Sequence, residues 1–217
     1  MWVVASKHAM RDRSPLQTTL TLVLLGATFY GIIFSARASR AFQIYYDTKY
    51  EHSAYESEVA QTGRPLLTPQ EINDRCEEIL RLYPFSYLTC HIAAEASYHN
   101  RHVDFYPLLE QSRRWTDRGL NLNPYHQSLT LRRVGIYEKL YDYETALMHM
   151  KTYTEWNFWD PFNHARLAVL HAKLGDFETA DKELMTWVRY EPSFRETRKE
   201  IERIKARHAA AQTSPDS

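Results

Sequence analysis

The chain has 217 residues, and its 27 Lys and Arg residues balance its 27 Asp and Glu residues. Zero net charge argues against a nucleic-acid partner, which requires a basic surface, and 44% hydrophobic residues argue against a wholly disordered chain. Six glycines are too few for Gly-rich phosphate-binding loops. The length allows one domain of ordinary size, or a domain with an anchor.

The first predicted element is an apolar helix that follows the N-terminal flank, residues 1–15. Residues 16–36 carry no charge, and 21 helical residues at about 1.5 Å each cover roughly the 30 Å of a hydrocarbon core. This pattern predicts a single transmembrane helix. Small residues recur every four positions in it, a spacing that lets a second transmembrane helix approach but that also occurs in helices without such a partner. These predicted packing residues are Ala27, Gly31 and Ser35.

A secretory signal peptide is the alternative interpretation of this segment. The flank is basic, and Ala36-Arg37-Ala38 fits the small-x-small pattern of a cleavage site, so that cleavage near Ala38 would release a soluble adaptor. The apolar run is longer than the usual signal core of about 7–15 residues, which favours retention. Three basic residues precede the run and three follow it, so charge leaves the orientation open. Signal-anchor logic favours a membrane protein with its C-terminal part on the extracytoplasmic side.

Residues 37–65 contain no helix breaker before Gly63 and predict a helical stalk that ends in a linker. Amphipathic runs separated by prolines and turns then predict a series of helices. These lie near residues 69–82, 86–99, 104–121, 125–140, 143–157, 162–174, 177–190 and 193–208. The tail, residues 209–217, is expected to be disordered.

The most informative pattern is a repeat, because LYDYETA at Leu140–Ala146 recurs as LGDFETA at Leu174–Ala180. The offset between the two copies, about 34 residues, resembles the period of the tetratricopeptide repeat family. Ala146 and Ala180 stand where two helices cross, and Tyr141 replaces the usual turn glycine. The resemblance implies an all-α fold in which residues 66–208 form an α-solenoid of about three helical hairpins with a C-terminal capping helix.

The same resemblance implies that a protein partner, as an extended peptide or a helix, binds in the concave groove formed by the first helix of each hairpin. Arg132 and Arg166 are one repeat period apart and therefore occupy equivalent positions. Two such arginines favour an acidic or carboxylate-bearing ligand, although a solvated helix face explains them equally well. The expected groove residues are Ser128, Leu131, Arg132, Glu138, Phe162, Arg166 and Val169.

Chemical signatures are few. Cys76 and Cys90 are equidistant from a predicted turn, so they form either a disulfide or two buried thiols, according to the compartment. His99 and His102 lack a third ligand in register and are interpreted as polar turn residues. No hydrolase, zinc-protease, Walker or Rossmann motif occurs, so we expect no catalytic residue, no metal and no cofactor, and the chain is predicted not to be an enzyme.

Together these patterns predict a membrane-anchored interaction module that acts as a scaffold or assembly factor. A second hypothesis belongs to a different class of protein. A transmembrane helix before a short irregular repeat region, including Asn123-Pro124-Tyr125, resembles the C-terminal end of O-antigen ligase-like membrane proteins. On that hypothesis the chain is a detached accessory region in cell-envelope polysaccharide assembly.

Overall fold

The computed structural model describes residues 15–62, 67–99, 105–187 and 195–213, and its regular structure over these residues is entirely helical. Most predicted helix ends agree with the observed ends within two residues. The helices are α2 (Pro15–Thr62), α3 (Pro69–Leu82), α4 (Tyr87–His99), α5 (Phe105–Leu122), α6 (Gln127–Lys139), α7 (Tyr143–Trp156), α8 (Pro161–Lys173), α9 (Phe177–Trp187) and α10 (Arg195–Thr213).

The C-terminal end of α10 corrects one expectation. The helix continues to Thr213, five residues past its predicted end at 208, so the expected disorder of 209–217 is wrong for the first five of these residues. Three consecutive alanines, residues 209–211, have the highest helix propensity of any residue type and carry the helix onward.

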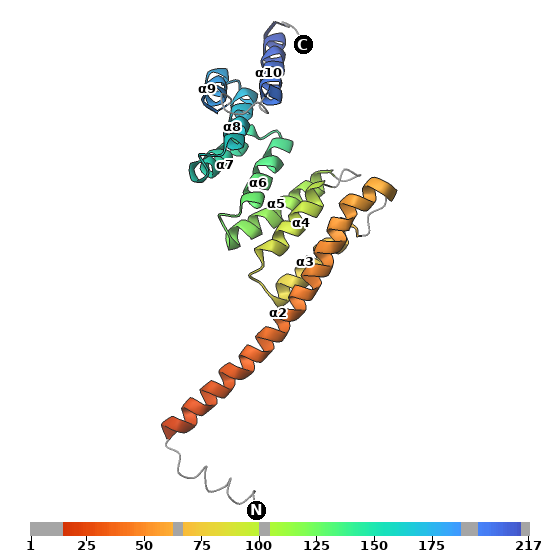
Figure 1. Ribbon diagram of the computed structural model, residues 1–217, viewed down its shortest axis with the longest axis vertical. Coiled ribbons are helices and arrows are strands. Elements are labelled where there is room, and N and C mark those ends of the chain that lie inside the picture. Colours follow the sequence, from red (N-terminus) through yellow and green to blue (C-terminus); the bar gives the residue numbers. More distant parts are fainter. Residues whose placement is uncertain (1–14, 63–66, 100–104, 188–194, 214–217) are drawn as a thin grey trace, which may run out of the picture. The chain divides into compact units, whose positions relative to one another are not determined.

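The chain divides into two compact units. The first contains residues 1–66 and 74–85, and the second contains residues 67–73 and 86–217. In the first unit, α2 is a single continuous helix of 48 residues, and α3 runs beside its middle in the opposite direction (Figure 1). Arg75 of α3 forms an ion pair of 2.8 Å with Glu51, while Arg81 meets Arg37 near the other end.

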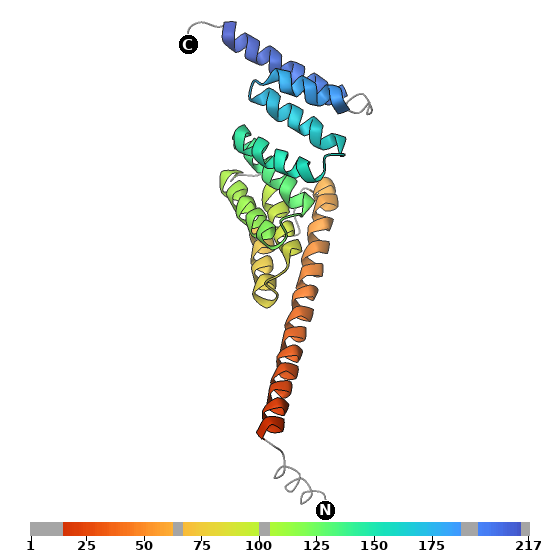
Figure 2. The ribbon, with the colours of Figure 1, turned by 90° about the vertical axis from the view of Figure 1, so that its left-hand side faces the viewer.

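The second unit consists of successive helical hairpins, α4 with α5, α6 with α7 and α8 with α9, and α10 packs on the last of them. Figure 2 shows these helices stacked in chain order. This arrangement confirms the predicted solenoid of three hairpins and a capping helix. We call α4, α6 and α8 the A helices, because each is the first of its hairpin, and α10 occupies the next position in the series.

The hydrophobic core of this unit lies between neighbouring hairpins. One cluster joins α6, α7 and α8 through Val134, Ala146, Met150, Tyr153, Leu167 and Leu170. A second joins α8 and α9 to α10 through Ala168, Val169, Ala172, Ala180, Leu184 and Ile201. The apolar residues are therefore buried both within a hairpin and against the next one, as a stacked repeat requires.

The sequence repeat has a physical basis at the start of α7 and of α9. Asp142 accepts a hydrogen bond of 3.1 Å from the Thr145 backbone N–H, and Asp176 accepts the equivalent bond of 3.2 Å from Thr179. Both aspartates thereby cap a helix N-terminus. The alanine that follows each threonine is fully buried, which lets the two helices of a hairpin approach closely.

The turn before each of these caps needs a left-handed backbone conformation. Gly175 has φ of 82°, and Tyr141, its equivalent, has φ of 60° although it carries a side chain. A tyrosine in this region is strained, because its Cβ crowds the backbone, whereas glycine adopts the conformation freely. The unusual residue noted in the sequence therefore keeps the geometry of the glycine that it replaces.

Replacing Tyr141 with glycine is expected to raise the free energy of unfolding by about 0.5–1 kcal/mol, since it removes the strain. Little packing is lost, because the Tyr141 side chain is 75% exposed. The matched variant Gly175→Ala should lower the same quantity by about 1 kcal/mol, because alanine is strained at this φ. No clash adds to this loss, since the new Cβ would meet only His208, at an ordinary contact distance of 3.6 Å. Guanidinium unfolding followed by circular dichroism measures both, and equal destabilisation by the two variants would contradict the strain.

Candidate functional site

The A helices bring a set of charged and aromatic side chains to one face of the second unit. On α6, Arg132 and Gly135 are separated by one helical turn, and on α8 Arg166 and Lys173 lie two turns apart. Side-chain contacts link these residues to one another and to α4. We call this set the groove network: Glu95, Tyr98, Arg132, Glu138, Lys139, Arg166 and Lys173.

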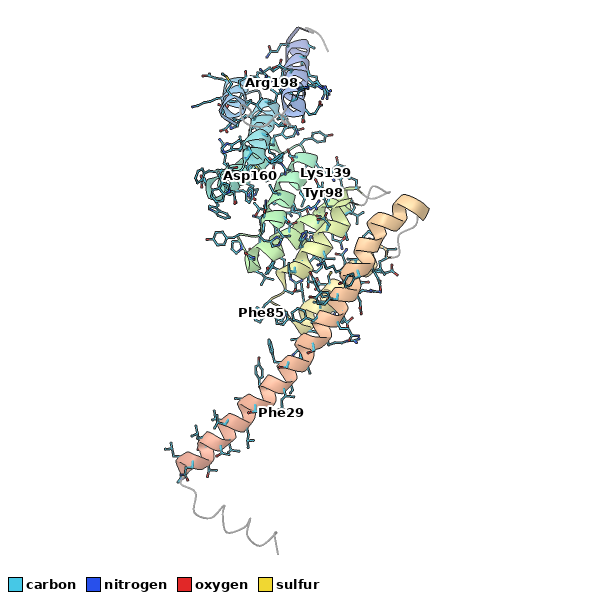
Figure 3. The ribbon with its side chains drawn as sticks, viewed as in Figure 1. Phe29, Phe85, Tyr98, Lys139, Asp160 and Arg198 are labelled. Atoms are coloured by element: carbon cyan, nitrogen blue, oxygen red, sulfur yellow. The ribbon has the colours of Figure 1, made fainter. Side chains whose placement is uncertain are left out.

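The first part of the network joins α4 to α6. Arg132 forms an ion pair and hydrogen bond with Glu95, and its guanidinium lies 3.9 Å from the centre of the Tyr98 ring. The Lys139 ammonium lies 3.5 Å from the same ring centre, and it donates a hydrogen bond of 3.3 Å to the Tyr98 carbonyl (Figure 3). Tyr98 is therefore a cation-binding ring between two basic side chains.

Burial raises the pKa of the Tyr98 phenol, against the opposing effect of the Arg132 and Arg166 charges. The hydroxyl consequently stays protonated at neutral pH. It lies close to Gly135, where an added Cβ would come within 2.7 Å of the Tyr98 oxygen. The glycine on α6 thus makes room for the tyrosine of α4.

The second part of the network joins α6 to α8. Arg166 donates a hydrogen bond of 2.6 Å to the Glu138 carboxylate, and the Lys173 ammonium lies 3.8 Å from the other oxygen of that carboxylate. The side chains of all three residues are less than one third exposed, so the charges are partly desolvated and interact more strongly than surface pairs. The two equivalent arginines therefore each bind a glutamate, Glu95 or Glu138.

An open pocket of about 670 Å³ continues from Lys173 toward the capping helix. Its lining combines basic and acidic side chains from α10 with the start of α7. The lining residues are Tyr143, Lys173, Glu196, Thr197, Glu200, Arg203, Ile204, Arg207, His208 and Ala211. The pocket offers a partner an amphiphilic space beside the charged network.

The predicted groove residues fall into two kinds. Ser128 and Phe162 are exposed in the first turns of α6 and α8, and the Phe162 backbone N–H donates to the Asp160 cap over 3.0 Å. Leu131 is partly buried against one hydrophobic cluster, and Val169 belongs to the other. These two apolar residues therefore pack mainly within the core.

The other residues singled out in the sequence stay predictions. Cys76 and Cys90 are both fully buried, and no observation bears on their pairing. Ala27, Gly31 and Ser35 are exposed along α2, as a packing stripe requires. His102 and the side chain of His99 lie outside the described residues. Within the described part of the chain, no group of three His, Cys, Asp or Glu side chains is arranged to hold a metal ion.

No protein-family model matches the sequence, and no curated protein matches it. Among solved structures, the chain is similar to TTC0263, a thermophilic TPR protein of Thermus thermophilus, with 15% identity and a TM-score of 0.49 over 80% of this chain and 99% of that one. It is also similar to the MamA protein, with 11% identity and a TM-score of 0.45 over 86% of this chain and 100% of that one. The tetratricopeptide-like arrangement rests on the repeat and the helix pairs of this chain itself.

Sequence reasoning missed four residues that complete the network: Glu95, Tyr98, Lys139 and Lys173. The repeat period could have found one pair of these, because Lys139 and Lys173 stand one period apart, as Arg132 and Arg166 do. The second and third hairpins thus each carry an Arg and a Lys at equivalent positions of the A helix. Tyr98 carries no such signal, since its role depends on how α4 packs against α6.

The start of α6 is expected to lose stability in acid. The His126 Nδ1 atom accepts a hydrogen bond of 3.3 Å from the Leu129 backbone N–H, which only a neutral imidazole can do, and burial lowers the pKa of His126. In acid the unfolded chain therefore binds more protons than the folded chain. The stability that neutral His126 contributes is fully present above its pKa in the unfolded chain, about 6.5, and is lost progressively as the pH falls below that value.

This pH dependence can be measured as the Tm of the full chain in detergent at pH 7.5 and at pH 5.5. His126→Asn keeps an N-cap acceptor that does not titrate, so its Tm should fall less than that of the wild type. Burial also lowers the pKa of His149, so the Tm of both proteins should still fall somewhat between pH 7.5 and pH 5.5. An identical fall in Tm in the two proteins would exclude His126 as a cause of the acid sensitivity.

Proposed function

We propose that the chain is a single-pass membrane protein that holds a protein partner in the groove of its A helices, with the repeats on the extracytoplasmic side. It acts as a scaffold or assembly factor. Tetratricopeptide-like folds are typically binding modules without enzymatic activity, and the proposal assigns no catalytic residue and no cofactor.

The groove network carries the binding part of this proposal. Arg132 and Arg166 stand at equivalent positions of successive hairpins, and Glu95 and Glu138 hold their side chains in place. A guanidinium has five N–H donors, and the hydrogen bond of Arg166 to Glu138 uses one of them, which leaves donors of Arg166 for a carboxylate of the partner. The fixed order of positive and negative charges favours a partner segment with acidic side chains at matching intervals.

The properties of α2 support the anchoring part. Its apolar segment is long and apolar enough to cross a membrane: its mean hydropathy is 1.8, and none of its most apolar stretch is buried. The helix also continues without a break through Ala38, the residue at which a signal peptide would be cleaved. Cleavage there would remove Phe34 and Arg37, both of which contact α3 or the residue that follows it. These contacts favour retention over a secreted form.

Site-specific photocrosslinking in the cells that produce the chain tests the groove. Benzoylphenylalanine at Ser128, which is exposed on α6 near Arg132, should give an adduct with a discrete protein. The same group at Met148, exposed on the second helix of that hairpin, is the matched control and should give none. Equal adducts from both positions would contradict a groove site.

Charge reversal then tests the role of the arginines. Arg166→Glu should reduce the Ser128 adduct at least tenfold if that charge contributes about 1.4 kcal/mol to binding. The reversal also places two carboxylates together, so the control is Arg166→Glu combined with Glu138→Arg, which restores the pair in opposite order. If the partner recognises which position carries the positive charge, the adduct should be lost in both variants. Recovery of the adduct in the swapped pair would mean that Arg166 has only a structural role.

A further inference from the structure

A row of aromatic rings follows one side of α2 past the end of its apolar segment. The rings recur every four residues, and neighbouring rings stack with centroids 6.3–6.5 Å apart. We call this row the aromatic ladder; it consists of Tyr30, Phe34, Phe42, Tyr46 and Tyr50. The one position in this spacing that lacks a ring is Ala38.

A ring next to the end of α3 completes the ladder at this position. The Tyr83 centroid lies 6.0 Å from that of Phe34 and 6.1 Å from that of Phe42, so Tyr83 bridges the two rings on either side of Ala38. Phe85 then packs edge-on against Tyr83, with centroids 6.0 Å apart. The segment Tyr83-Pro84-Phe85 is thus fixed beside residues 34–42 of α2.

A hydrogen bond fixes the end of α3 at the same level. The Arg37 guanidinium donates over 2.7 Å to the Arg81 carbonyl, one of the last carbonyls of α3 that has no partner within its own helix. Arg37 is also the first charged residue after the apolar run. The end of α3 therefore lies where the apolar surface of α2 gives way to charge.

This level corresponds to the headgroup layer of a membrane that α2 crosses. The layer is about 5–8 Å thick on each side of the hydrocarbon core, and the helix rises about 9 Å from Ala36 to Phe42. Tyrosine and tryptophan concentrate in this layer, interfacial segments also insert phenylalanine there, and an arginine at its inner edge can reach the phosphates. Phe85 is 63% exposed and Phe42 is 53% exposed, so both residues offer apolar surface at this level of α2.

We propose that the segment Tyr83-Pro84-Phe85 is a second membrane contact, with the Phe85 ring inserted in the headgroup layer of a phospholipid bilayer. The inference rests on the proposed anchoring of α2. The chain would then contact the lipid both through the spanning helix and through this segment. The aromatic ladder would hold the segment in position. Tyr83 is a positioning residue, and Phe85 contacts the lipid.

Depth-dependent fluorescence quenching tests this contact with the full chain in liposomes of phosphatidylcholine and phosphatidylglycerol. Phe85→Cys carries the dye NBD, and the liposomes contain a lipid with a nitroxide either at the headgroup or deep in the acyl chain. Both native cysteines are fully buried, so the dye reacts with the new thiol. Phe85 is largely exposed, so its replacement does not threaten folding.

Two reference positions on α2 calibrate the depth. Phe29→Cys lies inside the apolar segment, where 67% of the side chain is exposed, and its dye should be quenched by the deep nitroxide (Figure 3). Lys49→Cys lies about 18 Å beyond Arg37 along the helix, and neither nitroxide should quench its dye. The dye at Phe85→Cys should be quenched at least twofold more by the headgroup nitroxide than by the deep one.

Each outcome separates the two proposals. If the dye at Phe29→Cys is quenched and the dye at Phe85→Cys behaves as it does at Lys49→Cys, the chain is anchored but the second contact does not exist. If the dye at Phe29→Cys is not quenched, the anchoring and the second contact both fail. Dye self-quenching at Phe85→Cys that grows with protein density, without nitroxide quenching, would overturn the lipid contact and assign the surface to a second copy of this chain.

Discussion

Replacing Leu170 with alanine is expected to lower the free energy of unfolding by about 2–5 kcal/mol. Leu170 of α8 is fully buried and belongs to the cluster that joins α6, α7 and α8. Truncation removes apolar contacts and leaves a cavity between two hairpins, which the rigid helix pairs can close only in part. Because each repeat is stabilised by its neighbours, the loss weakens the connection between the second and third hairpins.

Guanidinium unfolding of the full chain in detergent, followed by circular dichroism, measures this effect. Leu174→Ala is the matched control, because Leu174 follows α8 directly and its side chain is 38% exposed. The control should lose only about 1–2 kcal/mol, since Leu174 is partly exposed and belongs to neither hydrophobic cluster. Equal losses in the two variants would mean that the cluster does not join the hairpins in solution.

Placing arginine at Leu25 is expected to cause the second large effect, a loss of membrane retention. Leu25 lies near the middle of the apolar segment, where an arginine costs about 2.5–3.5 kcal/mol, equivalent to a roughly 100-fold decrease in the insertion equilibrium. Gln17→Arg is the control, because a long side chain near the end of the segment reaches the headgroups. If the segment lies outside the membrane, Leu25→Arg and Gln17→Arg should behave alike.

The fraction of the chain that resists alkaline carbonate extraction reports this change. The wild type and Gln17→Arg should remain with the membrane, and Leu25→Arg should appear in the soluble fraction. A chain cleaved near Ala38 would instead be extracted in all three forms. The mass of the N-terminal peptide identifies such cleavage directly, because it shows whether the segment before Ala38 is still present. Retention of Leu25→Arg at the wild-type level would contradict a spanning segment.

The helices were predictable because their signals are local. Asp142 and Asp176 cap helices, Ala146 and Ala180 allow close crossing, and the repeat period places both features in equivalent hairpins. Thr68 illustrates the same point at the start of α3, where its backbone N–H donates a hydrogen bond of 2.7 Å to the Glu71 side chain three residues later. Such patterns depend on neighbours within a few residues, so one sequence suffices to find them.

The groove network was less predictable, because its contacts join distant residues. Arg132 meets Glu95, 37 residues away, and Arg166 meets Glu138, 28 residues away. Which acidic residue faces which arginine depends on the rotation between successive hairpins, and a single sequence does not specify it. The aromatic ladder had a visible signal, since its rings recur every four residues, but the bridging role of Tyr83 required the packing of α3 on α2.

The unbroken length of α2 has a mechanical consequence. For a chain anchored as proposed, the helix is a stiff lever whose pivot lies in the bilayer, because no proline or glycine interrupts it between Arg37 and Thr62. A bilayer of different thickness changes the tilt of a spanning helix. A change of about 10° would move the far end of this lever, roughly 38 Å beyond Arg37, sideways by about 7 Å. Membrane thickness could thus be converted into the lateral position of whatever the far end of the helix supports.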